Sequence, residues 1–244
     1  MKYIYHLLKH IKSFMFHPIE STRWLLSDLK KDINASNYDS KMKSVWCAGL
    51  PKSGTSLIEE IFDQLPYVRH DASFLRIYNP KKLDHIHGVN QDIFKEMKEN
   101  RYTFLKTHSH YSLTYENLAI KYNVKIIVSL RDLRDMMISR YFHIINEENH
   151  WLNKKISKLS FKDGFITSLI SKPTAEEKNS LTYYYYWILN WLKIAKEKNY
   201  LVLWYEDYKD DPLNYINKIL KFTSFPDFYA ERILKKIQNK NSEN

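Results

Sequence analysis

The chain has 244 residues, enough for one domain whose hydrophobic core needs neither disulfides nor a metal to fold. Its composition is 44% hydrophobic, 15% aromatic and 27% charged, which excludes a disordered or collagen-like chain, and its 4 glycines and 7 prolines are too few for a turn-rich β-sandwich or barrel. The net charge of +10 fits either a basic cleft for an anionic ligand or a generally lysine-rich composition, and without a basic tail or zinc-finger spacing it does not predict nucleic-acid binding.

The first 43 residues are predicted to form a helical segment that docks on the domain. Apolar side chains recur there at helical spacing, opposite a face of lysines; they are Ile4, Leu7, Leu8, Ile11, Phe14 and Met15. A helix lying on a membrane surface is the alternative, which would give a peripheral membrane contact. No apolar run reaches the length of about 18 residues that indicates a transmembrane segment. The single cysteine, Cys47, indicates a reducing compartment, so we expect a cytoplasmic protein.

From residue 44 onward, short apolar strands alternate with helical patterns, which is typical of an α/β domain with a parallel sheet. The predicted strands are Ser44–Leu50, Tyr102–Thr107, Val124–Leu130 and Tyr200–Tyr205, with Tyr67–His70 as a weaker fifth. Helices are expected at Ser56–Leu65, Ile93–Asn100, Met136–Asn146, Leu181–Lys198, Leu213–Phe222 and Phe228–Ile237. The polar, weakly patterned stretch 149–178 is interpreted as an excursion from the core that serves as a substrate lid.

The segment Gly49–Ser56 joins the first strand to the first helix, where α/β proteins bind phosphate with backbone N–H groups and the helix dipole. It differs from the loop of nucleotide triphosphatases, because Lys52 precedes the second glycine and Thr55 takes the usual position of the lysine. The lysine therefore lies on the rim of the loop, where it can reach a group beyond the first phosphate.

Three further motifs lie at predicted strand ends. Arg131–Asp135 follows Val124–Leu130, and its arginine offers a fork for a phosphate that Ser139, eight residues on, can also reach. The structural alternative is an ion pair between Arg131 and Asp135. Tyr205-Glu206-Asp207 ends the last strand, and Lys106-Thr107-His108 ends another.

Together the four motifs resemble those of the sulfotransferase family that uses 3′-phosphoadenosine 5′-phosphosulfate (PAPS), over roughly residues 44–225. The resemblance implies a single α/β domain, residues 44–244, with a five-stranded parallel sheet like that of P-loop nucleotide kinases. It also implies transfer of a sulfuryl group from PAPS to a hydroxyl or amine of a small-molecule, glycan or lipid acceptor, without a metal.

The resemblance also implies a role for each motif residue. PAPS is expected to be bound on its 5′ side by Lys52, Ser53, Gly54, Thr55 and Ser56. Arg131 and Ser139 are expected to bind its 3′-phosphate, and Tyr205 is expected to lie beside its adenosine. The implied catalytic residues are Lys52 on the leaving oxygen, Lys106 as a second cation and His108 as the base, with His110 and Asp71 as fallback bases.

The chain departs from the family pattern at three places. Leu57 replaces a tryptophan that would stack on the base, and Leu133 replaces a proline. A C-terminal R-K-G motif is missing. Arg232, Lys235 and Lys236 on the last predicted helix either substitute for it or form a solvated helix face.

Two other functions stay open at this stage. In a P-loop kinase or triphosphatase, Asp132 would hold magnesium after the hydrophobic strand; the third possibility is a non-catalytic nucleotide-binding relic. The His85/His87 and His108/His110 pairs lack further ligands at zinc spacing, so no metal site is predicted. The run Tyr183–Tyr186 is interpreted as core packing.

Overall fold

The computed structural model describes residues 43–65, 68–70, 103–148, 150–172 and 180–242. Several predictions lie outside the described residues: the N-terminal segment up to residue 42, the helix Ile93–Asn100, Asp71 and the pair of His85 and His87.

A parallel sheet lies at the centre of the domain, with strand order β2-β3-β1-β4-β5. The strands are β1 (Val45–Gly49), β2 (Arg69–His70), β3 (Thr103–Thr107), β4 (Lys125–Leu130) and β5 (Leu201–Trp204). The predicted five-stranded parallel sheet is confirmed, although β2 has only two residues and the other four strands form most of the sheet. The central strand β1 is buried along its whole length, which explains its continuous apolar run.

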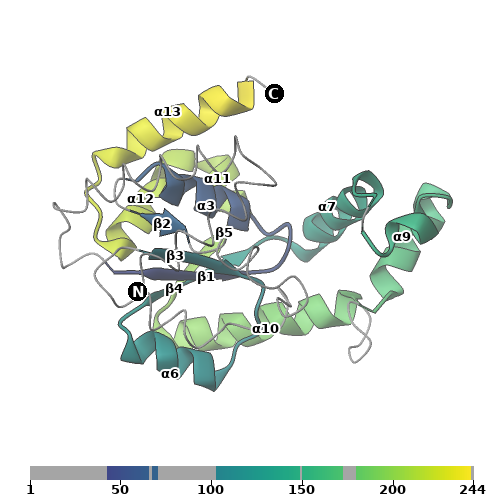
Figure 1. Ribbon diagram of the computed structural model, residues 1–244, viewed down its shortest axis with the longest axis horizontal. Coiled ribbons are helices and arrows are strands. Elements are labelled where there is room, and N and C mark those ends of the chain that lie inside the picture. Colours follow the sequence, from purple (N-terminus) through teal and green to yellow (C-terminus); the bar gives the residue numbers. More distant parts are fainter. Residues whose placement is uncertain (1–42, 66–67, 71–102, 149, 173–179, 243–244) are drawn as a thin grey trace, which may run out of the picture.

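Helices cover both faces of this sheet (Figure 1). On one face, α3 (Thr55–Asp63) and α12 (Pro212–Thr223) share a core with Val45 and Cys47, and α13 (Tyr229–Ser242) packs on these two helices. On the other face, α6 (Leu113–Lys121) and α10 (Ser180–Lys198) pack on Trp46 and Ala48. The side chains of one strand thus alternate between two cores, which is the arrangement of a three-layer α/β domain. None of the described helices is both long and apolar enough to cross a membrane.

The predicted excursion 149–178 contains two helices that its weak pattern did not predict, α8 (Asn153–Ile156) and α9 (Phe161–Ile170). With α7 (Leu133–Asn146) they form an arm at one end of the sheet (Figure 1). The arm has a small core of its own, made of Tyr141, Ile144, Leu152 and Ile156. A local signal was available in Ser160-x-x-Asp163, because the Ser160 hydroxyl accepts the Asp163 N–H and caps α9.

Other element boundaries also differ from the predictions. Helix α7 begins at Leu133 rather than Met136, because the Asp132 side chain accepts the Arg134 N–H and caps the helix three residues earlier. The last strand stops at Trp204, and Tyr205 begins the short helix α11 (Tyr205–Asp210). Neither α6 nor α11 was predicted.

Candidate functional site

The register of the sheet aligns the four motifs at one edge. Ala48 pairs with Thr107, Gly49 with Ser129, and Leu130 with Trp204. The loop after β1, the Lys106–His108 motif, Arg131 and Tyr205 therefore all leave the sheet at its carboxyl edge. Because the connections from β1 and β4 run to opposite sides of the sheet, this edge is a topological switch point, the usual ligand position in α/β folds.

The loop between β1 and α3 has a strained backbone. Lys52 has φ 71° and Gly54 has φ 96°, both in the left-handed region. For a lysine this conformation costs about 1 kcal/mol, so the surrounding loop must hold it. Ser53 does so, since its N–H and hydroxyl both donate to the Leu50 carbonyl, at 3.1 and 2.7 Å. The Lys52 side chain is exposed as a result.

The underside of the loop rests on the ends of β1 and β4. A Cβ at Gly49 would lie 2.3 Å from Thr55 Cγ2 and 2.9 Å from Ser129 Cβ, so only glycine fits there. The buried Ser129 hydroxyl donates to the Ser53 carbonyl at 2.9 Å. Ser53 is therefore a buried part of the loop framework, while Ser56 lies exposed in the first turn of α3.

The Tyr205 ring joins three of the motifs. On one side it contacts Gly54, where a Cβ would lie 2.9 Å from Tyr205 Cδ2. On the ring face, the Arg131 guanidinium carbon is 4.8 Å from the centroid, and Lys209 Nζ is 5.3 Å away. Two cations over one aromatic ring gather positive charge next to the loop.

Arg131 is oriented by groups from two other elements. Its Nη1 donates to the Lys52 carbonyl at 3.4 Å, and its Nε is 4.0 Å from Glu206 Oε1. The same Glu206 oxygen accepts the Asp132 N–H at 3.3 Å, so it ties α11 to the start of α7. Within the described part of the chain, Arg131 Nε and Glu206 Oε2 are buried without hydrogen-bond partners. The guanidinium therefore has an unused donor.

Asp132, the magnesium ligand of the kinase alternative, has other partners. Arg134 donates to it from Nε at 3.0 Å and from Nη2 at 2.8 Å, and these hydrogen bonds hold the pKa of Asp132 well below its usual range. Its role here is to cap α7. The kinase alternative is not favoured.

Lys106 and His108 leave β3 beside the loop. Lys106 Nζ forms an ion pair with Glu59 of α3, which offsets its charge. His108 Nδ1 lies 2.5 Å from the Gly49 carbonyl. Since a carbonyl oxygen only accepts, Nδ1 carries the proton, and the lone pair of the neutral ring is on Nε2. His110 packs edge-on against Tyr183, with ring centroids 4.6 Å apart.

The remaining predicted residues lie on α7 and α13. Ser139 lies half-buried on α7, two turns beyond its start. Arg232, Lys235 and Lys236 are exposed on α13, and Lys236 bonds to Gln64 beyond the far end of α3. These three cations form a solvated helix face.

Sequence reasoning missed the residues that support the site. Glu59, Ser129 and Glu116 each bond to a group far away in the chain, and no local pattern marks them. Gly49 could have been found, because a glycine at the end of a buried strand often marks close backbone approach.

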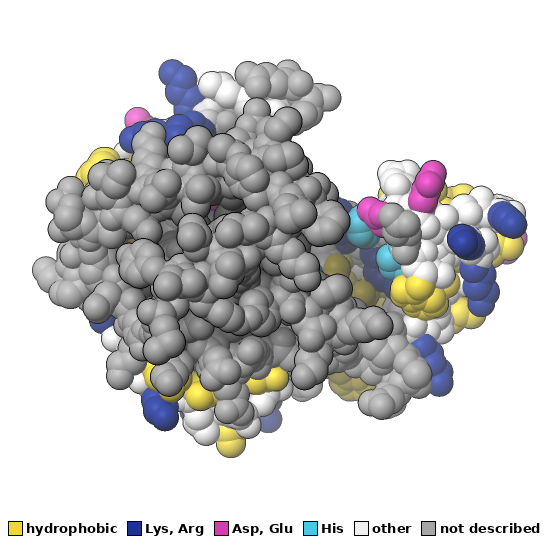
Figure 2. Space-filling model, in the orientation of Figure 1, with side chains coloured by type: hydrophobic (Ala, Val, Ile, Leu, Met, Phe, Trp, Pro, Cys, Tyr) yellow, Lys and Arg dark blue, Asp and Glu magenta, His cyan; other side chains and the backbone are white. Residues whose placement is uncertain are grey.

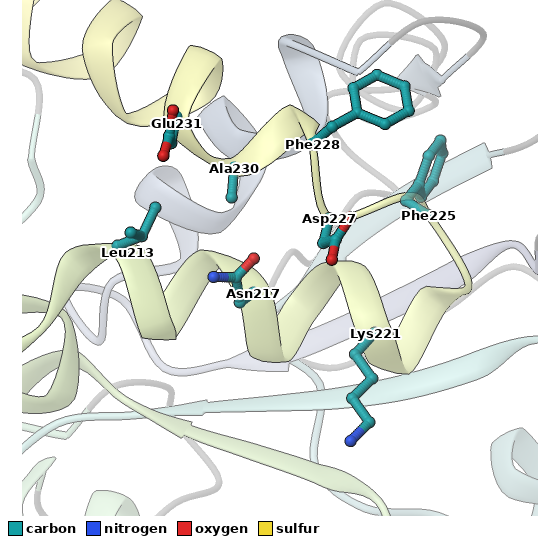
Figure 3. Close-up of a pocket in the computed structure, with 8 residues that line it drawn as sticks. All are labelled: Leu213, Asn217, Lys221, Phe225, Asp227, Phe228, Ala230 and Glu231. Atoms are coloured by element: carbon teal, nitrogen blue, oxygen red, sulfur yellow. The ribbon is translucent and has the colours of Figure 1, made fainter.

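No group of three or more His, Cys, Asp or Glu side chains gathers around a potential metal position among the residues that the structure describes. A cavity of about 700 Å³ lies between α12 and α13, lined by Leu213, Asn217, Phe225 and Phe228 among others (Figure 3). None of its lining residues belongs to the four motifs, so it is separate from the site described above.

Comparison with known proteins gives the same assignment as the motifs. The family model described as "Sulfotransferase domain" matches residues 42–244. Flavonol 3-sulfotransferase of Flaveria bidentis is 26% identical over 200 residues, which are 80% of this chain and 61% of that protein. The chain thus spans about three fifths of the length of this relative.

Two solved structures share the fold at low identity. Mouse sulfotransferase SULT7A1 complexed with PAP has a TM-score of 0.56 at 19% identity, covering 86% of this chain and 69% of that one. A sulfotransferase from Alicyclobacillus acidocaldarius has a TM-score of 0.52 at 19% identity, covering 76% and 82%. With its motifs aligned on one sheet edge and the family model matching most of its length, the chain belongs to the sulfotransferase family.

Proposed function

We propose that this protein transfers a sulfuryl group from PAPS to a hydroxyl or amine acceptor by in-line displacement. The observation that carries the proposal is the contact of Tyr205 with both Gly54 and Arg131, because it combines an aromatic ring, a phosphate-type loop and a cation in one site. The mouse neighbour complexed with PAP, adenosine 3′,5′-bisphosphate, supports a donor of this chemistry.

In the proposed donor complex, the 5′-phosphate lies at the start of α3. The first N–H groups of a helix have no partner within the helix, and Gly54 offers no side chain to cap them. Thr55 and Ser56 add hydroxyl groups, whereas Ser53 contributes through the shape of the loop. Arg131 binds the 3′-phosphate with its guanidinium, Ser139 contributes from α7, and Tyr205 lies beside the adenosine.

The proposed chemistry needs a cation and a base. The acceptor oxygen attacks sulfur, the bond from sulfur to the 5′-phosphate oxygen breaks, and the electron pair stays on that phosphate. Lys52, exposed on the loop rim, stabilises the leaving oxygen. His108 takes the acceptor proton on Nε2, which carries the lone pair when Nδ1 donates to the Gly49 carbonyl. Lys106 acts as the second cation, and its ion pair with Glu59 offsets part of its charge.

The proposed acceptor is a small molecule with an apolar body that carries a hydroxyl or an amine. The name of the flavonol relative is consistent with this class. The arm of α7 and α9 begins within the Arg131 motif and exposes Phe142, Phe161, Ile166 and Ile170. Figure 2 shows hydrophobic side chains beside Lys, Arg and His on this arm. The stretch 149–178, which contributes α8 and α9 to this arm, keeps its proposed role as a substrate lid.

A cytoplasmic location is also retained as a proposal, and the buried free thiol of Cys47 supports it.

Ligand-dependent thermal unfolding tests the donor assignment. PAP at about 100 times its Kd should stabilise the fold by about 2.7 kcal/mol, which raises Tm by about 5–10 °C. ATP with magnesium serves as the competing ligand, and stabilisation by ATP–Mg alone would contradict the proposal. Transfer of radiolabelled sulfate from PAPS to a panel of phenols, alcohols, sugars and amines then identifies the acceptor.

A further inference from the structure

The segment that carries His108 is anchored from the α10 face of the sheet. Thr107 accepts the Trp46 indole N–H at 2.8 Å. Four residues on, the Tyr111 hydroxyl donates to Glu116 at 2.7 Å, and Glu116 is 1% exposed. These two contacts hold both ends of the segment Thr107–Tyr111.

The middle of the segment is held by two tryptophans of α10. Trp187 Nε1 donates to the Ser109 carbonyl at 3.1 Å, and Trp191 Nε1 donates to the same oxygen at 3.2 Å. Ser109 and both indoles are 0% exposed. The two tryptophans are four residues apart and share one helix face, so both lone pairs of one carbonyl are used.

This arrangement restricts His108. Thr107, Ser109 and Tyr111 are held on the α10 side of the sheet, through a hydroxyl oxygen, a backbone carbonyl and a phenol hydroxyl respectively. His108 lies between the anchors at Thr107 and Ser109, and its Nδ1 lies 2.5 Å from the Gly49 carbonyl. The bond that sets the tautomer of His108 thus depends on where the Ser109 peptide is held.

We propose that Trp187 and Trp191 are positioning residues for His108, acting through the Ser109 carbonyl. The inference rests on the proposed function, in which His108 is the base. Packing alone requires only the apolar rings, which phenylalanine also supplies. Two indole N–H groups on one buried carbonyl are a specific polar arrangement, because each donor would otherwise lack a partner.

The variants Trp187→Phe, Trp191→Phe and the double variant test this role. Each single variant leaves one donor on the carbonyl, and kcat for sulfation of 4-nitrophenol by PAPS should fall about threefold to fivefold. The double variant leaves the carbonyl unsatisfied, and kcat should fall about 100-fold, with the Kd of PAP unchanged within about twofold. Ile219→Ala, a buried cavity variant on the opposite face of the sheet, controls for lost stability.

Two readouts separate positioning from general loss of structure. In a His108→Ala background, the tryptophan substitutions should lower kcat no further, whereas undiminished additive losses would overturn the inference. If the double variant does not fold, the same double-mutant cycle with His108→Ala is measured with each single tryptophan variant. In ¹⁵N-histidine spectra, His108 should be the Nδ1–H tautomer in the wild type and a mixture in the variants; an unchanged tautomer would also overturn it. The spectra need no acceptor, so they decide the inference even if PAPS turnover, and with it the proposed function, fails.

Discussion

Replacement of Arg131 by alanine tests the proposed 3′-phosphate site. The guanidinium stacks on Tyr205, reaches the Lys52 carbonyl and keeps a buried Nε without a hydrogen-bond partner among the described residues. It is therefore held in place beside the loop, where its guanidinium is expected to meet the 3′-phosphate. Arg131→Ala removes this guanidinium and leaves the Glu206 carboxylate without its ion-pair partner.

The expected loss can be estimated from these contacts. A charge-assisted hydrogen-bonded pair contributes about 1.5–3 kcal/mol. Glu206, half-buried and no longer offset by the guanidinium, adds repulsion towards the 3′-phosphate. We expect a loss of about 2–3 kcal/mol, which is an increase of about 30- to 150-fold in the Kd of PAP.

Isothermal titration with two ligands measures this effect. Adenosine 5′-phosphosulfate lacks the 3′-phosphate, so its Kd should barely change. Arg134→Ala is the matched control, because Arg134 is 87% exposed and bonded to Asp132. The double variant Arg131→Ala/Glu206→Gln should recover part of the affinity. Equal losses for both ligands, or an equal effect of Arg134→Ala, would refute the reasoning.

Three other substitutions address the remaining site and the fold. Lys52→Ala should lower kcat about 10²- to 10³-fold with little change in the Kd of PAP; a tenfold weaker Kd with unaffected single-turnover chemistry would make Lys52 a binding residue instead. His108→Ala should lower kcat about 10²- to 10⁴-fold and remove the acidic limb of the pH–rate profile, and persistence of that limb would place the base elsewhere. Burial raises the pKa of Glu116, but hydrogen bonds from Tyr200 and Tyr111 and the Lys198 ammonium outweigh it and lower the pKa overall. The stability from this lowered pKa is present above the unfolded value of about 4.3 and is lost as pH falls through the folded value, so Glu116→Gln should destabilise at neutral pH and the difference should shrink in acid, as measured by denaturant unfolding across pH.

Much of the site could be predicted because its parts are local. Each motif is a short run at the end of a strand, and parallel strands bring their carboxyl ends to one edge. The sequence therefore predicts that Lys52, Arg131, Tyr205 and His108 lie at the same edge of the sheet. Strand patterning was equally informative, since buried parallel strands are continuous apolar runs.

Prediction was weaker where tertiary packing outweighs local pattern. Helices α8 and α9 are stabilised by Tyr141 and Ile144 of α7, and α6 by the core beneath β1 and β4. Short helices gain most of their stability from packing rather than from propensity, so a weak pattern in 149–178 said little about their presence.

The sequence by itself determined the fold class, the sheet edge and the identity of the motif residues. Only the tertiary structure decided which partners these residues have. Glu59 pairs with Lys106 and Glu206 with Arg131, and the indoles of Trp187 and Trp191 bond to the Ser109 carbonyl next to His108. Those partners are separated by tens of residues, and a buried polar group takes whichever donor or acceptor the packed elements bring within about 3 Å of it.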